Sequence, residues 1–323
     1  MIKKTKLWRL IAVLTLGLMT ISILSGCAPA DKAEKVEKIN ITYVKSPLNV
    51  PSIIQKSQNM LASEFGKDNI EVAFHEITAG PKQTQALAAG SLDILNALGA
   101  TSAILAAANG VDLKIISIFS RAPEAFMIIS KTPDIDEPAD LKGKKVGGPT
   151  GTVLHQLLMA ALTANSLTAQ DIEFVSMDIP SAVAAMQNGS IDAALAAGPA
   201  SLRALNAGAH IVTTGEGLVE GAIVVAVRGE FLRKHPDLVK RFNKVHQESL
   251  AFIKNNPEET YRLTAEETGL SVEDVKKMFP WYDFNHEIKP SDIEEMKKTQ
   301  EFLIKNGMLT NSIKIEDLIV TLK

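Results

Sequence analysis

The sequence has few of the residues that build covalent or metal-centred sites. Cys27 is the only cysteine among 323 residues, so no disulfide can form within one chain. The six histidines are scattered, without the close spacing expected of a histidine-rich metal site. Aromatic residues make up 5% of the chain, which does not suggest a stacking platform for single-stranded nucleic acid. The composition therefore predicts no metal, no cofactor and no nucleic acid partner.

The N-terminal apolar stretch is too short to span a membrane. Leu10 to Leu24 has 15 residues, whereas a spanning helix needs about 20. Four basic residues precede this stretch, and Leu24-Ser25-Gly26-Cys27 ends it, which resembles a bacterial lipobox. We interpret residues 1–26 as a lipoprotein signal peptide and Cys27 as the lipidated first residue of the exported protein. A diacylated cysteine carries the two acyl chains that stable anchoring requires.

A charged segment follows the lipidated cysteine. Residues 27–38 contain a single large apolar side chain, so they are predicted to form a flexible tether. The body would then be held at the outer, extracytoplasmic face of the cell membrane. Without the signal peptide the chain has 30 basic and 37 acidic side chains, a net charge of about −7. This acidic balance also disfavours nucleic acid binding.

One stretch of sequence occurs twice, about a hundred residues apart. Residues 81–102 and 180–201 align without a gap. Solenoid repeats run over roughly 20 to 50 residues, so a period this long assigns each copy to its own lobe. Two similar lobes facing each other make a ligand cleft. The shared residues are Pro81 and Pro180, Gly90 and Gly189, Asp93 and Asp192, Gly99 and Gly198, and Ser102 and Ser201.

Apolar strand-like runs alternate with helical ones in both lobes. This order predicts an α/β protein in which each lobe is a mainly parallel sheet covered by helices. In the first lobe the expected strands are 39–44, 70–76, 92–97 and 113–119, with helices 53–65, 83–89 and 101–109. In the second, the strands are 144–147, 171–176, 191–195 and 209–213, with helices 153–164, 182–187 and 200–205.

Two further apolar runs, 125–130 and 222–227, are the predicted crossings between lobes. Lobe 1 would therefore comprise residues 39–124 plus 222–323, and lobe 2 residues 125–221. The rest of the chain is helical and is expected to pack on lobe 1. Its helices are predicted at 235–254, 258–268, 271–278 and 291–306.

The strand-to-helix loops are the candidate ligand site. In open parallel sheets, ligands bind beyond the carboxyl ends of strands, where helix N-termini present unpaired N–H groups. Four such loops would line the cleft, two from each lobe. An alternative is that their hydroxyls only cap their own helices. The candidate ligand-binding residues are Leu48, Asn49, Gly99, Ala100, Thr101, Ser102, Thr150, Gly151, Thr152, Gly198 and Pro199.

Other residues near the predicted cleft have two interpretations each. Arg121 could pair with an anionic ligand or form a salt bridge within the protein. Trp281 and Tyr282 could reach over the cleft mouth or close a helical subdomain. No nucleophile, base and acid can be assigned as a catalytic set from the sequence.

Three segments carry a resemblance to a known family. They are Asp140-Leu-Lys-Gly-Lys-Lys-Val-Gly-Gly-Pro-Thr-Gly-Thr, Asn188-Gly-Ser-Ile-Asp-Ala-Ala and Glu301-Phe-Leu-Ile-Lys-Asn-Gly-Met-Leu. The chain resembles the solute-binding lipoproteins of ABC importers, in the group that handles aliphatic sulfonates, taurine, nitrate and thiamine-precursor pyrimidines. The resemblance implies a two-lobe, type II periplasmic-binding-protein fold that closes on its ligand by hinge motion.

The same resemblance implies the partners. A monomer would capture a small molecule and deliver it to a membrane permease and its ATPase, without acting as an enzyme. Sulfonate binders of the group often carry a tryptophan where this chain has Ala194, which leaves room for a larger or flatter ligand. The ligand would be a sulfonate or other anion, or a neutral heteroaromatic. The alternative function is a ligand-sensing receptor that signals to a membrane partner.

Overall fold

The computed structural model describes residues 35–45 and 48–322. The predicted signal peptide and Cys27 lie outside the described residues. The chain divides after Val36 into two units, and the architecture below is that of the unit from Glu37 onward. No helix among the described residues is both long enough and apolar enough to cross a membrane. The described part also contains no group of three or more His, Cys, Asp or Glu side chains placed to hold a metal ion.

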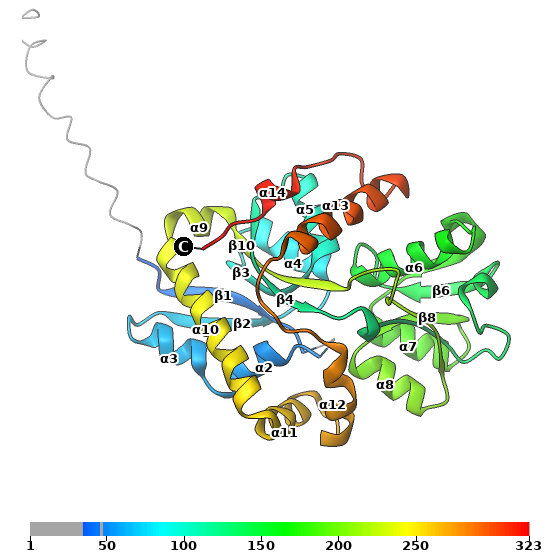
Figure 1. The fold of residues 1–323 in the computed structure, drawn as a ribbon, viewed down its shortest axis with the longest axis horizontal. Coiled ribbons are helices and arrows are strands. Elements are labelled where there is room, and N and C mark those ends of the chain that lie inside the picture. The colour runs from blue at the N-terminus through cyan, green and yellow to red at the C-terminus, as the bar shows by residue number, and fades with distance from the viewer. Residues whose placement is uncertain (1–34, 46–47, 323) are drawn as a thin grey trace, which may run out of the picture. The chain divides into compact units, whose positions relative to one another are not determined.

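Two five-stranded sheets form the framework of this unit (Figure 1). Sheet one has the order β2 (Glu71–Glu76), β1 (Lys38–Tyr43), β3 (Ile94–Gly99), β10 (Ala222–Arg228) and β4 (Leu113–Arg121). Sheet two has the order β7 (Glu173–Ser176), β6 (Lys145–Gly148), β8 (Ala193–Ala197), β5 (Phe126–Ser130) and β9 (His210–Thr214). In each sheet the fourth strand, β10 or β5, is antiparallel to both neighbours. The prediction of mainly parallel sheets is confirmed.

The chain passes from one sheet to the other twice. It leaves sheet one after β4, builds all of sheet two from β5 to β9, and returns as β10 between β3 and β4. Below, the elements packed on each sheet are called the sheet-one half and the sheet-two half. The exact lobe boundaries at residues 124 and 221 stay a prediction.

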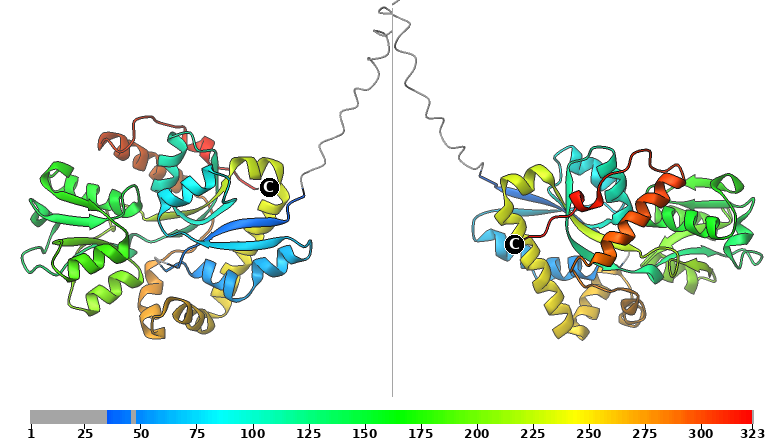
Figure 2. Two further views of the ribbon diagram at one scale, coloured as in Figure 1. Left: turned by 180° about the vertical axis from the view of Figure 1, so that it is seen from behind. Right: turned by 45° about the horizontal axis from the view of Figure 1, so that its top comes forward.

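Helices cover both faces of each sheet (Figures 1 and 2). On sheet one, α4 (Gly80–Ala88), α5 (Ala100–Ala108) and α13 (Pro290–Lys305) lie on one side, and α2 (Val50–Ser57), α3 (Met60–Gly66) and α10 (Pro236–Asn255) lie on the other. Sheet two lies between α6 (Val153–Ala164) and the pair α7 (Ile179–Gln187) and α8 (Pro199–Asn206). The shorter helices α9 (Gly229–Lys234), α11 (Pro257–Thr268), α12 (Val272–Met278) and α14 (Ile315–Leu318) complete the sheet-one half.

The repeated sequence forms the same substructure twice. The first copy is α4, β3 and the start of α5, and the second is α7, β8 and the start of α8. The carboxylate of Asp93 accepts the backbone N–H of Asn40 in β1 at 2.9 Å, and that of Asp192 accepts the N–H of Lys145 in β6 at 2.7 Å. Each aspartate therefore fixes the neighbouring parallel strand of its own sheet.

One predicted helix is wrong in its extent. The run 53–65 forms two helices, α2 and α3, because Asn59 adopts a left-handed conformation with φ of 52°. Asparagine tolerates this conformation better than most residues, so it can interrupt a run that remains apolar and periodic on both sides.

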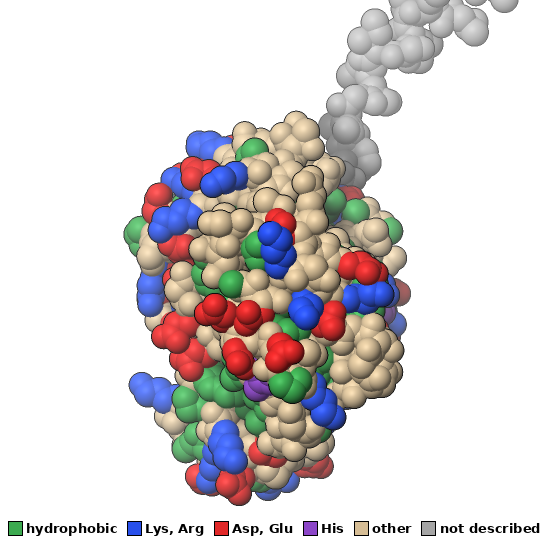
Figure 3. All heavy atoms as spheres, turned by 90° about the vertical axis from the view of Figure 1, so that its right-hand side faces the viewer, with side chains coloured by type: hydrophobic (Ala, Val, Ile, Leu, Met, Phe, Trp, Pro, Cys, Tyr) green, Lys and Arg blue, Asp and Glu red, His purple; other side chains and the backbone are tan. Residues whose placement is uncertain are grey.

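The end face of the sheet-two half shows both signs of charge (Figure 3). Acidic side chains gather in a band across the middle of this face, and basic side chains lie above and below the band. Asp136 and Glu137 are among the exposed acids of this half, and Asp136 lies 3.8 Å from the ring of His210.

Candidate functional site

A cavity of about 360 Å³ lies between the two sheets. This volume is within the range of small-molecule sites. Its walls come from both halves: Lys45, Asn49, Thr78, Gly99 and Ser102 are among the residues of the sheet-one half. Phe126, Thr152, Asp178, Pro199 and Arg203 are among those of the sheet-two half. A ligand held here would touch both halves at once.

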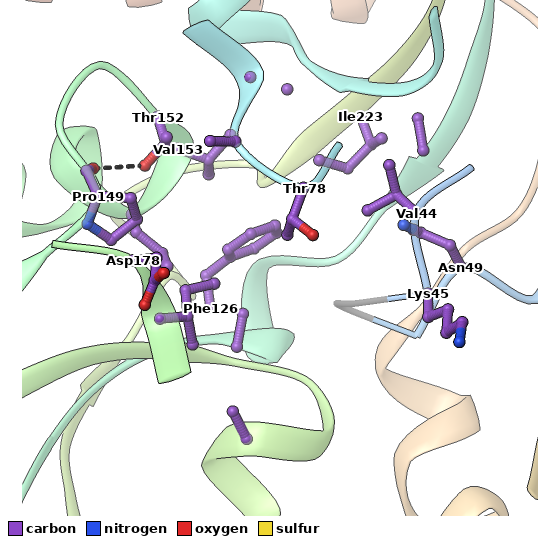
Figure 4. Close-up of a pocket in the computed structure, with 18 of the residues that line it drawn as sticks. Val44, Lys45, Asn49, Thr78, Phe126, Pro149, Thr152, Val153, Asp178 and Ile223 are labelled. Carbon is purple, nitrogen blue, oxygen red and sulfur yellow. Dashed lines mark hydrogen bonds between the residues drawn. The ribbon is translucent and has the colours of Figure 1, made fainter. Parts of the chain in front are cut away.

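Helix N-termini converge on this cavity (Figure 4). The residues that precede α2, α4, α5, α6 and α7 all line it, as does Pro199, the first residue of α8. The arrangement follows from the strand-to-helix order, which places helix starts at one edge of each sheet. Helix N-termini carry unpaired N–H groups and a partial positive charge, so the surroundings favour an anionic group.

Three charged side chains line the cavity, in distinct electrostatic states. The Lys45 ammonium lies 3.3 Å from a carboxylate oxygen of Glu267 and 3.8 Å from one of Glu76, so its charge is already balanced. Hydrogen bonds from Ser181 hold the pKa of Asp178 below its usual value, so this carboxylate is ionised at neutral pH.

Arg203 is the third charged residue, and it differs from the other two. Among the described residues its guanidinium has no hydrogen-bond or ion-pair partner. It lies one turn into α8, on the same helix face as Pro199 and Ala200, which also line the cavity. Because long side chains of a helix lean toward its N-terminus, Arg203 lies over the end of α8 that faces the cavity.

The rest of the wall is mainly apolar. The ring of Phe126 stands in the middle of the site in Figure 4, between Asp178 and Thr78. Leu154, Ile179, Ile223 and Val44 add further apolar surface. Phe126 begins β5, directly after the first crossing between sheets, so its position is fixed by the backbone that joins the two halves.

Hydrogen bonds join the two halves beside the cavity. The hydroxyl of Thr101 in α5 donates to the side-chain oxygen of Gln156 in α6 at 2.5 Å. The hydroxyl of Ser102 donates to the carbonyl oxygen of Gly151 at 2.8 Å. The Gln156 amide in turn donates to the Thr299 hydroxyl of α13 at 3.2 Å. This side of the cavity is therefore held together by direct contacts between α5 and the start of α6.

Five of the predicted ligand-binding residues line the cavity: Asn49, Gly99, Ser102, Thr152 and Pro199. Ala100 and Thr101 instead line a neighbouring cavity of about 20 Å³. Contact between a ligand and any of these residues stays a prediction.

The other predicted residues have structural contacts. Leu48 is buried, and its N–H donates to the Tyr282 hydroxyl at 3.0 Å. The exposed Thr150 hydroxyl donates to Ser176 at 2.7 Å, and the Gly151 carbonyl accepts from Ser102. Gly198 directly precedes α8 with φ of 60° and ψ of −135°, a conformation that glycine alone adopts without strain.

Arg121 forms the salt bridge that one of its two interpretations predicts, whereas both interpretations of Trp281 and Tyr282 stay predictions. Arg121 pairs with Asp292 at 2.6 Å and with Asp283 at 3.2 Å, within the sheet-one half. Trp281 packs against the hydrophobic core of the sheet-two half, and Tyr282 is buried.

Sequence reasoning missed Phe126, Asp178 and Arg203. Phe126 was part of a run assigned to a crossing strand, whose first side chain faces the cavity rather than the core. Asp178 precedes Ile179-Pro180, a helix-start pattern that marks it as a cap. Arg203 follows the predicted residue Pro199 by four positions, and helical spacing would have placed both on one face.

Comparison with known proteins gives the family. Residues 65–260, more than half of the chain, match the family model described as NMT1/THI5 like. A protein of Bacillus subtilis (strain 168) named for the binding of aliphatic sulfonates is 28% identical over 308 residues, which are 93% of this chain and 91% of that protein.

Solved structures share the fold. The alkanesulfonate-binding protein of Xanthomonas axonopodis pv. citri, bound to MOPS, is 21% identical with a TM-score of 0.81, over 90% of this chain and 100% of that one. A desulfurization enzyme is 15% identical with a TM-score of 0.66, over 88% of this chain and 96% of that one. The predicted two-lobe binding-protein fold is confirmed, and the fold itself serves both binding proteins and an enzyme. Together with the match over residues 65–260, the sequence and the architecture establish that the chain belongs to the NMT1/THI5-like family.

Proposed function

We propose that this protein is an extracytoplasmic solute-binding lipoprotein of an ABC importer. It captures a small organic anion in the cavity between the two sheets and delivers it to a membrane permease with its ATPase. The observation that carries the proposal is a cavity lined from both halves, onto which helix N-termini and the unpaired Arg203 converge. The names of the Bacillus and Xanthomonas proteins, which refer to sulfonates, support the same ligand class.

The mechanism is closure around the ligand. A ligand that touches both halves favours the closed state by its higher affinity for that state. The two crossings, between β4 and β5 and between β9 and β10, are the places where the backbone can bend.

The contacts of two cavity hydroxyls, those of Ser102 and Thr152, support binding rather than catalysis. Ser102 donates to the carbonyl oxygen of Gly151, and Thr152 donates to that of Pro149 at 2.9 Å. A nucleophilic hydroxyl needs a neighbouring base that can take its proton, and a backbone carbonyl cannot do so.

Anchoring at Cys27 completes the proposal. A lipid-anchored protein partitions into the detergent-rich phase of a cell extract, and a Cys27→Ala variant would move to the aqueous phase. Equal partitioning of both proteins would contradict the anchor without affecting the binding proposal.

Thermal unfolding in the presence of candidate solutes tests the binding proposal. The panel contains alkanesulfonates, taurine, nitrate, pyrimidines and riboflavin. A solute present at 100 times its Kd stabilises the folded state by about 2.7 kcal/mol, which raises Tm by several degrees. We expect this rise for an organic anion.

A pair of matched variants ties the rise in Tm to the cavity. Ala200→Phe places a ring in the cavity, and the response to the solute should disappear. Ala184→Phe makes the same change at an exposed position of α7 and should leave the response intact. Stabilisation by pyrimidines or riboflavin alone would contradict the anionic ligand, and no response to any solute would contradict solute binding.

A further inference from the structure

The first copy of the repeated segment contains a strained residue that the second copy lacks. Ala97, near the end of β3, has a φ of 85° and lines the cavity. A residue with a Cβ atom is destabilised at such an angle, whereas glycine is not. The aligned residue of β8, Ala196, does not have a positive φ. Of these two aligned positions, only the one in β3 is therefore strained.

A bulge in β3 is the source of this strain. β3 and β10 are antiparallel, and Leu98 and Asn96 face consecutive residues of β10, so Ala97 is an extra residue in the ladder. In the second copy, β8 pairs with β5 in one unbroken register that includes Ala196. Bulges bend a strand and redirect its side chains. The two copies therefore end their strands in different ways.

The bulge changes which side chains of β3 face the core. Side chains alternate along a regular strand, and Ala194 and Ala196 of β8, two positions apart, both pack in the core of their half. In β3 the corresponding pair is Leu95 and Leu98, three positions apart. The bulge thus turns Ala97 away from this pair and toward the cavity, and it sets the direction in which the chain enters α5.

Gln83 of α4 holds the bulge through its side-chain amide. Its Nε2 group donates to the carbonyl oxygen of Ile77 at 2.9 Å and to that of Ala97 at 3.5 Å. Gln83 is 1% exposed, so water cannot easily replace these hydrogen bonds. The aligned residue of the second copy is Ala182, whose side chain forms no hydrogen bonds. The bulge and the amide that contacts it therefore occur together, in the same copy.

The end of β3 leads directly into the contacts between the two halves. Thr101 and Ser102, at the start of α5, donate hydrogen bonds to the sheet-two half. We propose that Gln83 is a positioning residue, which holds the strained bulge at Ala97 and thereby orients the start of α5 toward the sheet-two half. This role does not depend on the identity of the solute that binds.

The same substitution at the two aligned alanines tests the strain. Ala97→Gly removes the strain, and we expect Tm to rise by about 1–3 °C in spite of the more flexible unfolded chain. Ala196→Gly places glycine in a regular, buried strand, and we expect Tm to fall by about 3–6 °C. A Tm that does not rise for Ala97→Gly overturns the proposal, because β3 then holds no strain.

Hydrogen exchange of the backbone N–H groups, followed by mass spectrometry, tests the contact with Gln83. Gln83→Met keeps a similar volume but lacks the amide, so residues 94–102 should exchange at least about fivefold faster. The aligned residues 193–201 should keep their wild-type rates. Gln85→Met, at an exposed position of the same helix, is the matched control and should change neither range. Adding Ala97→Gly to Gln83→Met should return residues 94–102 to slow exchange, because an unstrained bulge no longer needs the amide.

Small-angle scattering without solute tests the link to the sheet-two half. The radius of gyration of the Gln83→Met variant should exceed that of Gln85→Met, because Thr101 and Ser102 lose the orientation that brings them to their acceptors. The double variant with Ala97→Gly should have the wild-type radius. Equal radii for the two methionine variants, or exchange of residues 94–102 that Gln83→Met leaves unchanged, overturn the proposal. Since none of these measurements uses a solute, the proposed function stands or fails separately.

Discussion

The repeated aspartates illustrate how a single carboxylate can fix a strand. Asp192 accepts the N–H of Lys145 at 2.7 Å, so Asp192→Ala leaves this donor at the start of β6 without its partner. We expect the free energy of unfolding to fall by about 1–3 kcal/mol. Asp93→Ala should cost more, because Asp93 is buried and also pairs with Arg228 at 2.6 Å.

Urea unfolding followed by circular dichroism measures both losses. Asp134→Ala, at an exposed position of the sheet-two half, is the control and should be neutral within about 0.5 kcal/mol. Equal stability of the Asp192 and Asp134 variants would show that the strand does not depend on this carboxylate.

His246 couples folding to pH. It is fully buried, and burial, with a smaller contribution from His286, lowers its pKa to about 3. Gln55 donates its amide N–H to Nδ1 of His246 at 3.0 Å, and the orientation of that amide follows from its Oε1, which accepts from Asn96 at 2.8 Å. His246 is therefore neutral in the folded protein, with its proton on Nε2.

The sign of the pH effect follows from this neutral state. In the unfolded chain His246 titrates near 6.5, so between that pH and about 3 the unfolded state binds the extra proton. Its contribution to stability is complete above pH 6.5 and is lost as pH falls. His246→Leu should flatten the stability curve between pH 6 and 4 by up to about 1.4 kcal/mol per pH unit. Parallel curves for the two proteins, from urea unfolding at several pH values, would contradict the assignment.

At the scale of elements, Arg121 fixes α13 to the end of β4. Its guanidinium makes two hydrogen bonds to Asp292, at 2.7 and 2.6 Å, and Asp292 is 7% exposed. Burial alone would raise the pKa of Asp292, but hydrogen bonds, foremost from Arg121, hold it below its usual value. The pair thus joins two elements that are distant in the sequence.

Removing one member of the Arg121–Asp292 pair should destabilise the folded protein, because the other member is left as an unpaired buried charge. Arg121→Ala leaves Asp292 unpaired and should lower the free energy of unfolding by about 3–5 kcal/mol. Arg121→Lys, which keeps the charge but loses the planar fork, should lie between the wild type and the alanine variant. Adding Asp292→Ala to Arg121→Ala should restore part of the loss in a double-mutant cycle, and strict additivity would refute the coupling.

Most elements could be predicted from the sequence because local patterns determine them. Apolar alternation, terminal glycines and helix caps located the strands and the helices of both halves. The split between α2 and α3 was missed because it depends on the conformation of Asn59, which no periodicity reveals. The antiparallel direction of β10 and β5 was also missing from the prediction, since it arises from the order in which the chain joins two sheets.

The sequence predicts the location of the candidate site better than the identity of the residues that line it. Strand-to-helix loops indicated where ligands bind, and Asn49, Gly99 and Thr152 lie there. The hydroxyls of Thr101 and Thr150 are chemically suited to bind a ligand, yet they donate to Gln156 and Ser176. Which partner a hydroxyl finds depends on the packing of the two halves, and no local pattern contains that information.

At the scale of the whole folded unit, the contacts between halves set how readily the cavity opens. A ligand that contacts both halves favours the state in which they lie close together, and Thr101 and Ser102 donate hydrogen bonds between the halves. Affinity for the ligand is reduced in proportion as the binding-competent state becomes less populated. The strength of these hydrogen bonds therefore enters the measured Kd even for a ligand that touches neither hydroxyl.

Thr101→Val combined with Ser102→Ala removes both donors while changing the volume of the wall very little. At about 1 kcal/mol for each hydrogen bond, we expect Kd to rise about 10- to 30-fold. The radius of gyration from small-angle scattering should increase without ligand and return to the wild-type value at saturation. Thr150→Val is the control, because its hydroxyl donates to Ser176 within the sheet-two half. An unchanged radius with an unchanged Kd would mean that closure is governed by the backbone crossings beside β5 and β10 instead.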